Sequence, residues 1–423
     1  MSSRVEIGLE GVLASDNLPR AWAAVKANAG AGGVDGKGIG ETERHLETHW
    51  PGIREKLLRG DYRPAAVRGV EIAKPDGGTR QLGLPTVQDR LIQQALHQVM
   101  GAAFDGGMSE HSWGFRPNRS AHDGVTAARG YVKEGKVWVV DMDLKSFFDQ
   151  VNHDRLMHGL GERIADKRVL QPIGRYLRAP MRHGDGRQER RDRGTPQGGP
   201  PQGGPLSPLL ANLYLDALDR ELEQRGLSFV RYADDIAVFV ASERAARRVL
   251  ENLTDWLRKH LDLEVNAARS GVGRTQHTQW LGFRIHASGD VSPAPKALGR
   301  FKDRVRQLWD ARQSLTSEQL RDQWRRYSTG WWNYFRYANW RRGVHALSGW
   351  TRRHMRKCFW LRWHDRHGRL NALKRLGVRG RALGVAGCRR GAWPMARHVV
   401  VNQALKIATL NRHGFTLPWT LAG

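Results

Sequence analysis

The stretch FVRYADDIAVFV (229–240) places two adjacent acids, Asp234 and Asp235, between two apolar arms. Apolar arms around a short polar turn predict a β-hairpin. A second stretch, KVWVVDMD (136–143), is an apolar run that ends in carboxylates, which is typical of a buried strand. Taken alone, the acid pair is equally consistent with a solvated turn. Asp143 favours a metal site, because acids at a strand end and at a hairpin tip can meet around a cation, which offsets the cost of burying them.

Around these two stretches the chain divides into three zones. Residues 1–60 have helical periodicity at 18–26 and 45–58, separated by the glycine-rich loop AGAGGVDGKGIG (29–40). Residues 60–295 alternate short β-rich runs with helices, whereas the sequence from 296 onward is mostly helical, most strongly over 317–363. The pattern predicts an α/β or α+β fold followed by a helical domain, and we expect the α+β class.

Composition restricts the partners of the chain. Its 423 residues carry a net charge of +27, which requires an acidic partner such as nucleic acid or an anionic membrane surface. Residues 296–423 contain 28 Lys and Arg against 5 Asp and Glu, a net charge of +23, which leaves +4 for residues 1–295. The same segment holds 10 of the 16 Trp. Cations interleaved with aromatic rings favour nucleic acid, although each Trp taken singly is more often a core residue.

Other features argue against a membrane or secreted protein. The sequence has no run of 18 apolar residues, and its N-terminus lacks the basic-then-apolar order of a secretory signal. Two cysteines, Cys358 and Cys388, are too few for a disulfide framework or an all-cysteine zinc site. We therefore expect a cytoplasmic protein with no membrane partner.

Several motifs carry a resemblance to the reverse transcriptases, and within them to the proteins encoded by bacterial group II introns. The matching motifs are GVEIAKPDGGTRQLGLPTVQDRLIQQAL (69–96), WGFRPNRSAHDGV (113–125), DMDLKSFFDQVNHDRL (141–156), PQGGPLSPLLANLYLDALD (201–219), RYADDIAVF (231–239) and WLGFRIH (280–286). Further on, GWWNYFRYANW (330–340) resembles the maturase thumb and RRGAWPMARH (389–398) the short DNA-binding tail.

The resemblance implies a right-hand polymerase architecture. Fingers and palm would occupy residues 1–295, an α-helical thumb or maturase domain residues 296–370, and a basic DNA-binding tail residues 371–423. Many relatives end in an endonuclease that bears cysteine pairs, which this sequence lacks. The activity implied is RNA-directed DNA synthesis, together with binding of group II intron RNA to assist splicing and mobility.

The same resemblance assigns the catalytic acids. Asp143, Asp234 and Asp235 would be the catalytic triad and, with Leu144, the metal site for two Mg²⁺, with Mn²⁺ as an alternative ion. Two such ions activate a primer 3′-hydroxyl and stabilise the departing pyrophosphate, and Mg²⁺ requires hard oxygen ligands. Asp141 is two residues from Asp143 and so shares its face of the strand, where it could be a fourth acid of the site, although we expect a supporting or solvent-exposed role.

Four residues are expected to bind the incoming dNTP. Phe148 would be the aromatic gate that excludes a 2′-hydroxyl, whereas its neighbour Phe147 would be core. Lys74 and Arg80, on a predicted hairpin with the turn 75–78, would hold the triphosphate. Gln202 would lie near the nucleotide.

Two departures from the family pattern concern the dNTP site. A tandem PQGGP (196–205) duplicates the loop, and we favour Gln202 over Gln197 as the functional glutamine because the helix that follows fixes its position. Arg269 stands where the family usually has a lysine that protonates pyrophosphate. Because arginine stays protonated in proteins, it is a poorer general acid than lysine.

Basic residues in the helical stretch 350–366 are the expected nucleic-acid contacts, namely Arg352, Arg353, Arg356 and Lys357. The partners implied are an RNA template or group II intron RNA, a DNA primer or target, and dNTPs, with the protein in a ribonucleoprotein or at the nucleoid of a bacterial cell. Two alternatives remain open. One is a polymerase-impaired, RNA-binding maturase, and the other is a free-standing reverse transcriptase recruited to phage defence or DNA repair.

Overall fold

The computed structural model describes residues 5–73, 77, 79–189 and 204–420. The chain divides into two compact units, Met1–Thr278 and Gln279–Gly423, here called the N-terminal and C-terminal units. Each unit has its own apolar core. The domain boundary expected at residue 295 lies at the start of a helix, and the one expected at residue 370 lies inside another helix. The division into functional domains at these two positions stays a prediction.

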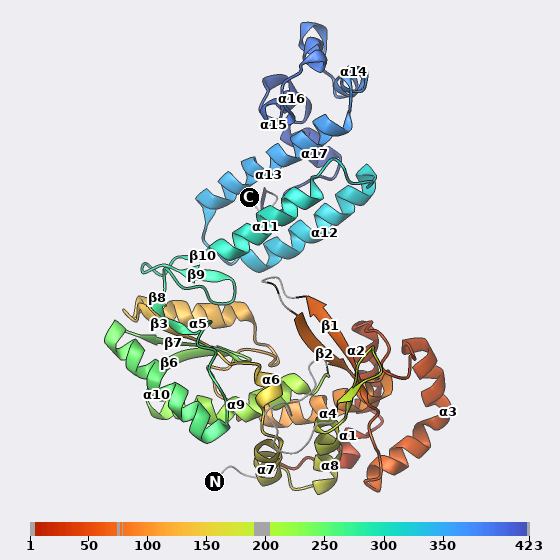
Figure 1. The fold of residues 1–423 in the computed structure, drawn as a ribbon, viewed down its shortest axis with the longest axis vertical. Helices are drawn as coiled ribbons and strands as arrows, with labels where there is room; N and C mark the ends of the chain where they lie inside the picture. The colour runs from red at the N-terminus through yellow and green to blue at the C-terminus, as the bar shows by residue number, and fades with distance from the viewer. Residues whose placement is uncertain (1–4, 74–76, 78, 190–203, 421–423) are drawn as a thin grey trace. The chain divides into compact units, whose positions relative to one another are not determined.

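The first part of the N-terminal unit is helical with one hairpin (Figure 1). Its elements are α1 Leu9–Val12, α2 Asn17–Ala27, α3 Ile39–Leu58, β1 Val67–Ala73, β2 Thr79–Leu84 and α4 Val87–Asp105. The helices at 18–26 and 45–58 expected from periodicity are confirmed as parts of α2 and α3. Strands β1 and β2 pair in antiparallel register from Arg68 opposite Leu84 to Ala73 opposite Thr79, which confirms the predicted hairpin.

A four-stranded sheet forms the second part of this unit. Its strands are β3 Trp138–Asp143, β6 Ser228–Tyr232, β7 Asp235–Val240 and β8 Gly271–Arg274, in the antiparallel order β6-β7-β3-β8. The predicted strand and the predicted hairpin are thus confirmed, and they are neighbours. Helices α5 Ala121–Lys133 and α10 Glu243–Leu261 pack against the sheet, α5 against β6 and β7 and α10 against β3, β7 and β8 (Figure 1).

Local sequence explains why these helices begin and end where they do. Ser242 caps α10 through the Ala245 N–H, and the helix ends at Asp262, which adopts a left-handed conformation with φ of +55°. Its buried residues follow one another at intervals of seven, four and four positions, as expected for one face of a helix: Ala246, Leu253, Leu257 and Leu261. The remaining elements of the unit are α6 Phe147–Gln150, α7 His153–Arg163, α8 Lys167–Leu177, β4 Met181–Arg182, β5 Gln188–Glu189 and α9 Ser207–Gln224.

The C-terminal unit is mostly helical, as predicted. After the short antiparallel pair β9 Phe283–Ile285 and β10 Val291–Pro293 it contains α11 Pro295–Leu308, α12 Ser317–Phe335, α13 Arg341–Arg362, α14 Arg366–Arg375, the 3₁₀ helix η1 Gly380–Gly387, α15 Ala392–Met395, α16 Val399–Ala404, α17 Ile407–Arg412 and η2 Pro418–Thr420. The helical stretch expected at 350–366 is interrupted. Helix α13 ends at Arg362, His364 takes a φ of +50°, and Asp365 caps the start of α14.

Tryptophans build much of the C-terminal core. Trp309, Trp324 and Trp360 are almost completely buried, and Trp419 is 7% exposed. Five further tryptophans pack against this core: Trp331, Trp332, Trp340, Trp350 and Trp363. The prediction that single tryptophans are core residues is therefore confirmed for the first four, whereas the next five are partly buried against the core and Trp393 is in neither group. In the described part of the chain, no helix is both long and apolar enough to span a bilayer.

Candidate active site

The sheet brings the predicted acids to one end. Asp143 is the last residue of β3 and lies directly opposite Asp235, the first residue of β7. Residues opposite each other on antiparallel strands have Cβ atoms about 4.5–5.5 Å apart and point to the same face. Asp234 occupies the turn between β6 and β7, which closes with Tyr232 opposite Asp235. Acids that are 91 residues apart in the sequence thus meet at one strand end.

The turn that carries Asp234 is tight. Ala233 has a φ of +58°, which a residue with a Cβ adopts only when its surroundings enforce it. Gly114 lies against this turn, because a Cβ at that position would come within 2.6 Å of the Ala233 nitrogen. The WGFRPN motif therefore supports the acid-bearing turn, and its glycine permits the close approach.

A buried ion pair between Arg231 and Asp219 is hydrogen-bonded to the same turn. The Arg231 guanidinium donates to both carboxylate oxygens of Asp219 in α9, at 2.7 and 2.5 Å, and both side chains are at most 1% exposed. Arg231 also donates to the Ala233 carbonyl at 2.9 Å and to the side-chain oxygen of Asn212 at 2.9 Å. Asn212 in turn donates to the Gly114 carbonyl.

Sequence reasoning missed this network, although one signal was present. Asn212 and Asp219 are seven residues apart, which places them on one face of a helix, and Arg231 interrupts an otherwise apolar strand. Buried charges of this kind are paired in folded proteins.

Asp143 is oriented by the loop before β8. Its main-chain N–H donates to Ser270 Oγ at 2.9 Å, and the Asn266 side-chain amide donates to Asp143 Oδ2 at 3.1 Å. The Arg269 guanidinium lies 4.0 Å from the same carboxylate oxygen. Arg269 therefore lies beside Asp143, at the position where the resemblance expects a lysine.

Two neighbours of Asp143 have different environments. Asp141 is half-buried on the same face of β3, and burial, reinforced by the charge of Asp143, raises the pKa of its carboxyl to about 6. Leu144 is buried and bridges to Val265, so it can offer a metal only its main-chain carbonyl. Met142 and Leu144 alternate with the two acids, which agrees with the strand periodicity.

The acids fit a magnesium site that substrate completes. Among the described residues, no group of three or more His, Cys, Asp and Glu side chains is arranged to hold a metal ion by itself. Mg²⁺ rarely uses such a cage, because it keeps several waters and binds one or two carboxylates plus substrate phosphates. Asp143 and Asp234 offer hard oxygen donors of this kind.

The structure describes only part of the expected dNTP site. Phe147 is buried at 2% exposure, whereas Phe148 is half-buried, with the two ring centroids 5.2 Å apart. The main chain of Arg80 lies in β2 opposite Ile72. Lys74, Gln197 and Gln202 lie outside the described residues. The roles of all these residues stay predictions.

The four basic residues expected to bind nucleic acid share α13 but not one environment. Arg356 donates to the Leu405 carbonyl at 3.2 Å, and burial lowers the pKa of its guanidinium. Burial likewise lowers the pKa of Arg352. Arg353 lies over the Trp393 ring at 5.3 Å, and Lys357 lines a cavity.

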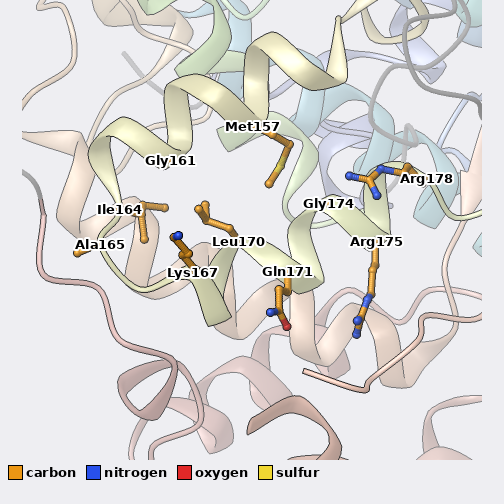
Figure 2. Close-up of a pocket in the computed structure, with 10 residues that line it drawn as sticks. All are labelled: Met157, Gly161, Ile164, Ala165, Lys167, Leu170, Gln171, Gly174, Arg175 and Arg178. Carbon is orange, nitrogen blue, oxygen red and sulfur yellow. The ribbon is translucent and has the colours of Figure 1, made fainter. Parts of the chain in front are cut away.

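A cavity of about 580 Å³ between α7 and α8 is separate from the acids (Figure 2). Met157, Ile164 and Leu170 line its apolar part, and its charged lining residues are the cations Lys167, Arg175 and Arg178. In Figure 2 Arg175 extends away from the apolar residues, and its guanidinium donates to the Tyr62 carbonyl. With no acid in its lining, this cavity does not suit a metal ion.

Comparisons with known proteins place two family models on the chain. The model described as Reverse transcriptase (RNA-dependent DNA polymerase) matches residues 72–285, and the one described as Group II intron, maturase-specific domain matches residues 298–377. The first match contains Asp143, Asp234 and Asp235.

Individual relatives cover part of the chain. Protein YkfC of Escherichia coli (strain K12) is 34% identical over 201 residues, which are 46% of this chain and 51% of the relative. The group II intron-encoded protein LtrA of Lactococcus lactis subsp. cremoris is 36% identical over 182 residues, 42% of this chain and 29% of the relative. A chain of the partial Cas6-RT-Cas1–Cas2 complex is 25% identical with a TM-score of 0.38, covering 58% of this chain and 42% of that one. The chain thus spans about half or less of the length of these relatives.

Proposed function

Because the chain belongs to the reverse transcriptase family and carries a match to the group II intron maturase-specific domain, we propose that it is an RNA-directed DNA polymerase and maturase. It copies an RNA template onto a DNA primer or target from dNTPs, and it binds group II intron RNA to assist splicing and mobility. The splicing chemistry belongs to the RNA, and the protein stabilises the folded RNA in a ribonucleoprotein.

The observation that carries the polymerase proposal is the register of β3 and β7. It sets Asp143 opposite Asp235 and leaves Asp234 in the adjoining turn. A structural role would not require three acids at one strand end, since like charges that meet without a cation destabilise the fold.

Reverse transcriptases use divalent metal ions, and we propose two Mg²⁺ here, with Mn²⁺ as an alternative. When bound, the ions activate the primer 3′-hydroxyl and stabilise charge on the departing pyrophosphate. Asp143 and Asp234 are the principal ligands, with Asp235 and the Leu144 carbonyl beside them. Ser270 and Asn266 orient Asp143 for this task.

The remaining groups handle the nucleotide. Phe148 closes the space that a 2′-hydroxyl would occupy, and Lys74 and Arg80 hold the triphosphate on the β1–β2 hairpin, with Gln202 beside the nucleotide. Arg269 contributes positive charge next to Asp143 rather than a proton. The net charge of +23 in residues 296–423, with Arg352, Arg353 and Lys357 on α13, supports RNA binding by the C-terminal unit.

Primer extension on an RNA template tests the polymerase. With Mg²⁺ and dNTPs the wild type extends the primer, whereas Asp234→Ala does not. Asp255→Ala, which removes an exposed acid in α10, is the matched control and keeps the activity. A wild type that extends no primer contradicts the polymerase proposal and favours the polymerase-impaired maturase.

Salt titration of RNA binding tests the second part. The logarithm of the affinity for a group II intron RNA falls linearly with the logarithm of the salt concentration, and the slope reports phosphate contacts. Replacing four exposed arginines of the C-terminal unit, Arg379, Arg381, Arg389 and Arg390, by Gln flattens this slope. Replacing four exposed cations of α10, Arg244, Arg248, Arg258 and Lys259, leaves the slope as it was. Equal slopes for both sets contradict a C-terminal RNA site.

A further inference from the structure

A second cavity lies inside the C-terminal unit, among α11, α13 and α15. Its volume is about 750 Å³, within the range of roughly 300–1,000 Å³ typical of sites for small organic ligands. Trp350, His354 and Lys357 face it from α13, at positions i, i+4 and i+7, which lie on one side of a helix. Trp393 of α15 and Arg306 of α11 also line it.

The wall of this cavity is aromatic. The His354 ring lies between Trp350 and Trp393, with centroid separations of 4.3 and 4.9 Å. Trp393 is the one tryptophan of residues 296–423 that neither belongs to nor packs against the described core, and it remains half-buried. The core therefore leaves this large aromatic ring partly exposed at the cavity wall, where it can contact a ligand.

Cations surround the aromatic wall. Arg306 lies over the Trp350 ring at 5.5 Å and Arg353 over the Trp393 ring at 5.3 Å. In the described part of the chain, the Lys357 ammonium makes no hydrogen bond or salt bridge, although it lies close enough to lower the pKa of Asp310. Asp310 is the single acid in the lining, and Arg312 neutralises it at 2.7 Å. The positive charge of the cavity therefore exceeds its negative charge.

The protonation of His354 agrees with this charge. Burial first, and then the charges of Lys357, Arg306 and Arg353, lower the pKa of the imidazole to about 4. At neutral pH the ring is uncharged, so it can contact an aromatic base. One of its nitrogens can donate a hydrogen bond and the other can accept one.

These properties select the ligand. A metal ion is repelled by the excess positive charge of the lining. An apolar ligand would desolvate the Lys and Arg side chains without pairing their charges, which is costly. An acidic peptide would use the cations but not the aromatic wall. A nucleotide uses both, because its base stacks on aromatic rings and its phosphate pairs with Lys or Arg.

We propose that this cavity binds one unpaired nucleotide of a structured RNA, with the base against Trp393, His354 and Trp350 and the phosphate on Lys357 and Arg306. The proposal rests on the RNA-binding function proposed above and names the part of the RNA that is recognised. Bases in bulges and loops can leave the helix and stack on protein rings, whereas paired bases cannot.

The test compares two RNA hairpins of equal length whose strands are joined by the same non-nucleotide linker, one with a single bulged uridine and one fully paired, bound to the full-length protein. Stacking of one base predicts that wild type prefers the bulged hairpin by roughly 5- to 150-fold. Trp393→Ala removes the preference, and Trp393→Phe, which keeps an aromatic ring, retains most of it. Lys357→Gln weakens binding of the bulged hairpin and lowers its salt slope by about 0.9, which Lys259→Gln in α10 does not do.

Several outcomes overturn the proposal. Equal affinity of the wild type for both hairpins, or an unchanged preference in Trp393→Ala, overturns the nucleotide site while leaving the general RNA-binding function intact. If the wild type binds neither hairpin, both the nucleotide site and the RNA-binding function are overturned. A 4-thiouridine at the bulge is expected to crosslink to peptides that contain Trp350 or Trp393, and crosslinks confined to other peptides contradict the assignment. A glutamate-rich peptide that binds with the same dependence on Trp393 would assign the cavity to protein ligands instead.

Discussion

Arg231 and Asp219 form an ion pair that is closed to solvent, and Arg231 is separated from the acid-bearing turn only by Tyr232. The pair joins α9 to the β6–β7 hairpin, and through Asn212 it reaches the WGFRPN motif. The position of Asp234 therefore depends on a charge pair in the core as well as on its own strand.

Breaking this pair is expected to destabilise the fold. Arg231→Met leaves Asp219 buried without its partner, which costs about 3–5 kcal/mol in the free energy of unfolding. The double variant Arg231→Met/Asp219→Leu regains most of that loss, because neither charge is then buried alone. Urea unfolding of both variants measures the difference.

Primer extension separates stability from positioning in the same variants. If Arg231 holds the turn, the double variant stays inactive after it regains stability, since the hydrogen bond to the Ala233 carbonyl is still missing. A double variant with wild-type extension would assign the pair to stability alone.

Phe148→Ala is expected to admit ribonucleotides. Removing the half-buried ring opens space beside the sugar, and the ratio of ribonucleotide to deoxyribonucleotide incorporation rises by roughly 10- to 100-fold. Phe147→Leu is the control, because that ring belongs to the core and its shortening changes stability rather than sugar choice. An unchanged ratio in Phe148→Ala would show that the ring is not a gate.

Arg269→Lys tests the departure from the family pattern. A lysine beside Asp143 can release a proton to pyrophosphate, which an arginine does poorly, so the single-turnover rate of nucleotide addition rises. General acid catalysis contributes roughly 10²–10⁴-fold, so the gain in rate is at most of that order. Arg269→Gln, which removes the charge, lowers the rate. A rate for Arg269→Lys at or below the wild type would contradict this prediction, because it would show that proton transfer from this position does not limit the reaction.

His354 makes stability depend on pH. Its pKa of about 4 in the folded protein lies below the ordinary histidine value of 6.5, so between these values the unfolded chain binds more protons. The free energy of unfolding therefore falls as pH decreases from about 6.5 toward 4, and this contribution is constant above 6.5. Urea midpoints at pH 7 and pH 5 should differ less in His354→Gln than in the wild type. Replacement of the exposed His413 by Gln is the control. If the urea midpoint falls equally between pH 7 and pH 5 in all three proteins, His354 is not the source of the pH dependence.

Much of the fold could be predicted because its signals are local. The apolar run that ends at Asp143 and the two arms around Asp234 are legible without tertiary information, and they became β3, β6 and β7. The break between α13 and α14 was missed, because no proline or glycine marks it and a positive φ at His364 is not visible in the sequence.

The parts that could not be predicted depend on long-range packing. The strand pattern marks Arg231 as a charge within an apolar run, but it does not identify Asp219 as the partner, since that residue lies on another element. Likewise, tryptophan spacing does not separate Trp360, which is buried, from Trp393, which lines a cavity. Composition located the positive charge correctly but could not tell which rings remained accessible.

Single-turnover addition of one dNTP by Asp143→Asn tests the central claim most directly, because this change keeps the side-chain shape and removes one ligand charge. If the acids opposite each other on β3 and β7 hold the catalytic ions, the rate falls by roughly 10²–10³-fold, equivalent to several kcal/mol of lost transition-state stabilisation. Asp255→Asn, the exposed control, keeps the wild-type rate. A rate for Asp143→Asn within a factor of a few of the wild type would contradict the assignment of this strand end as the polymerase centre.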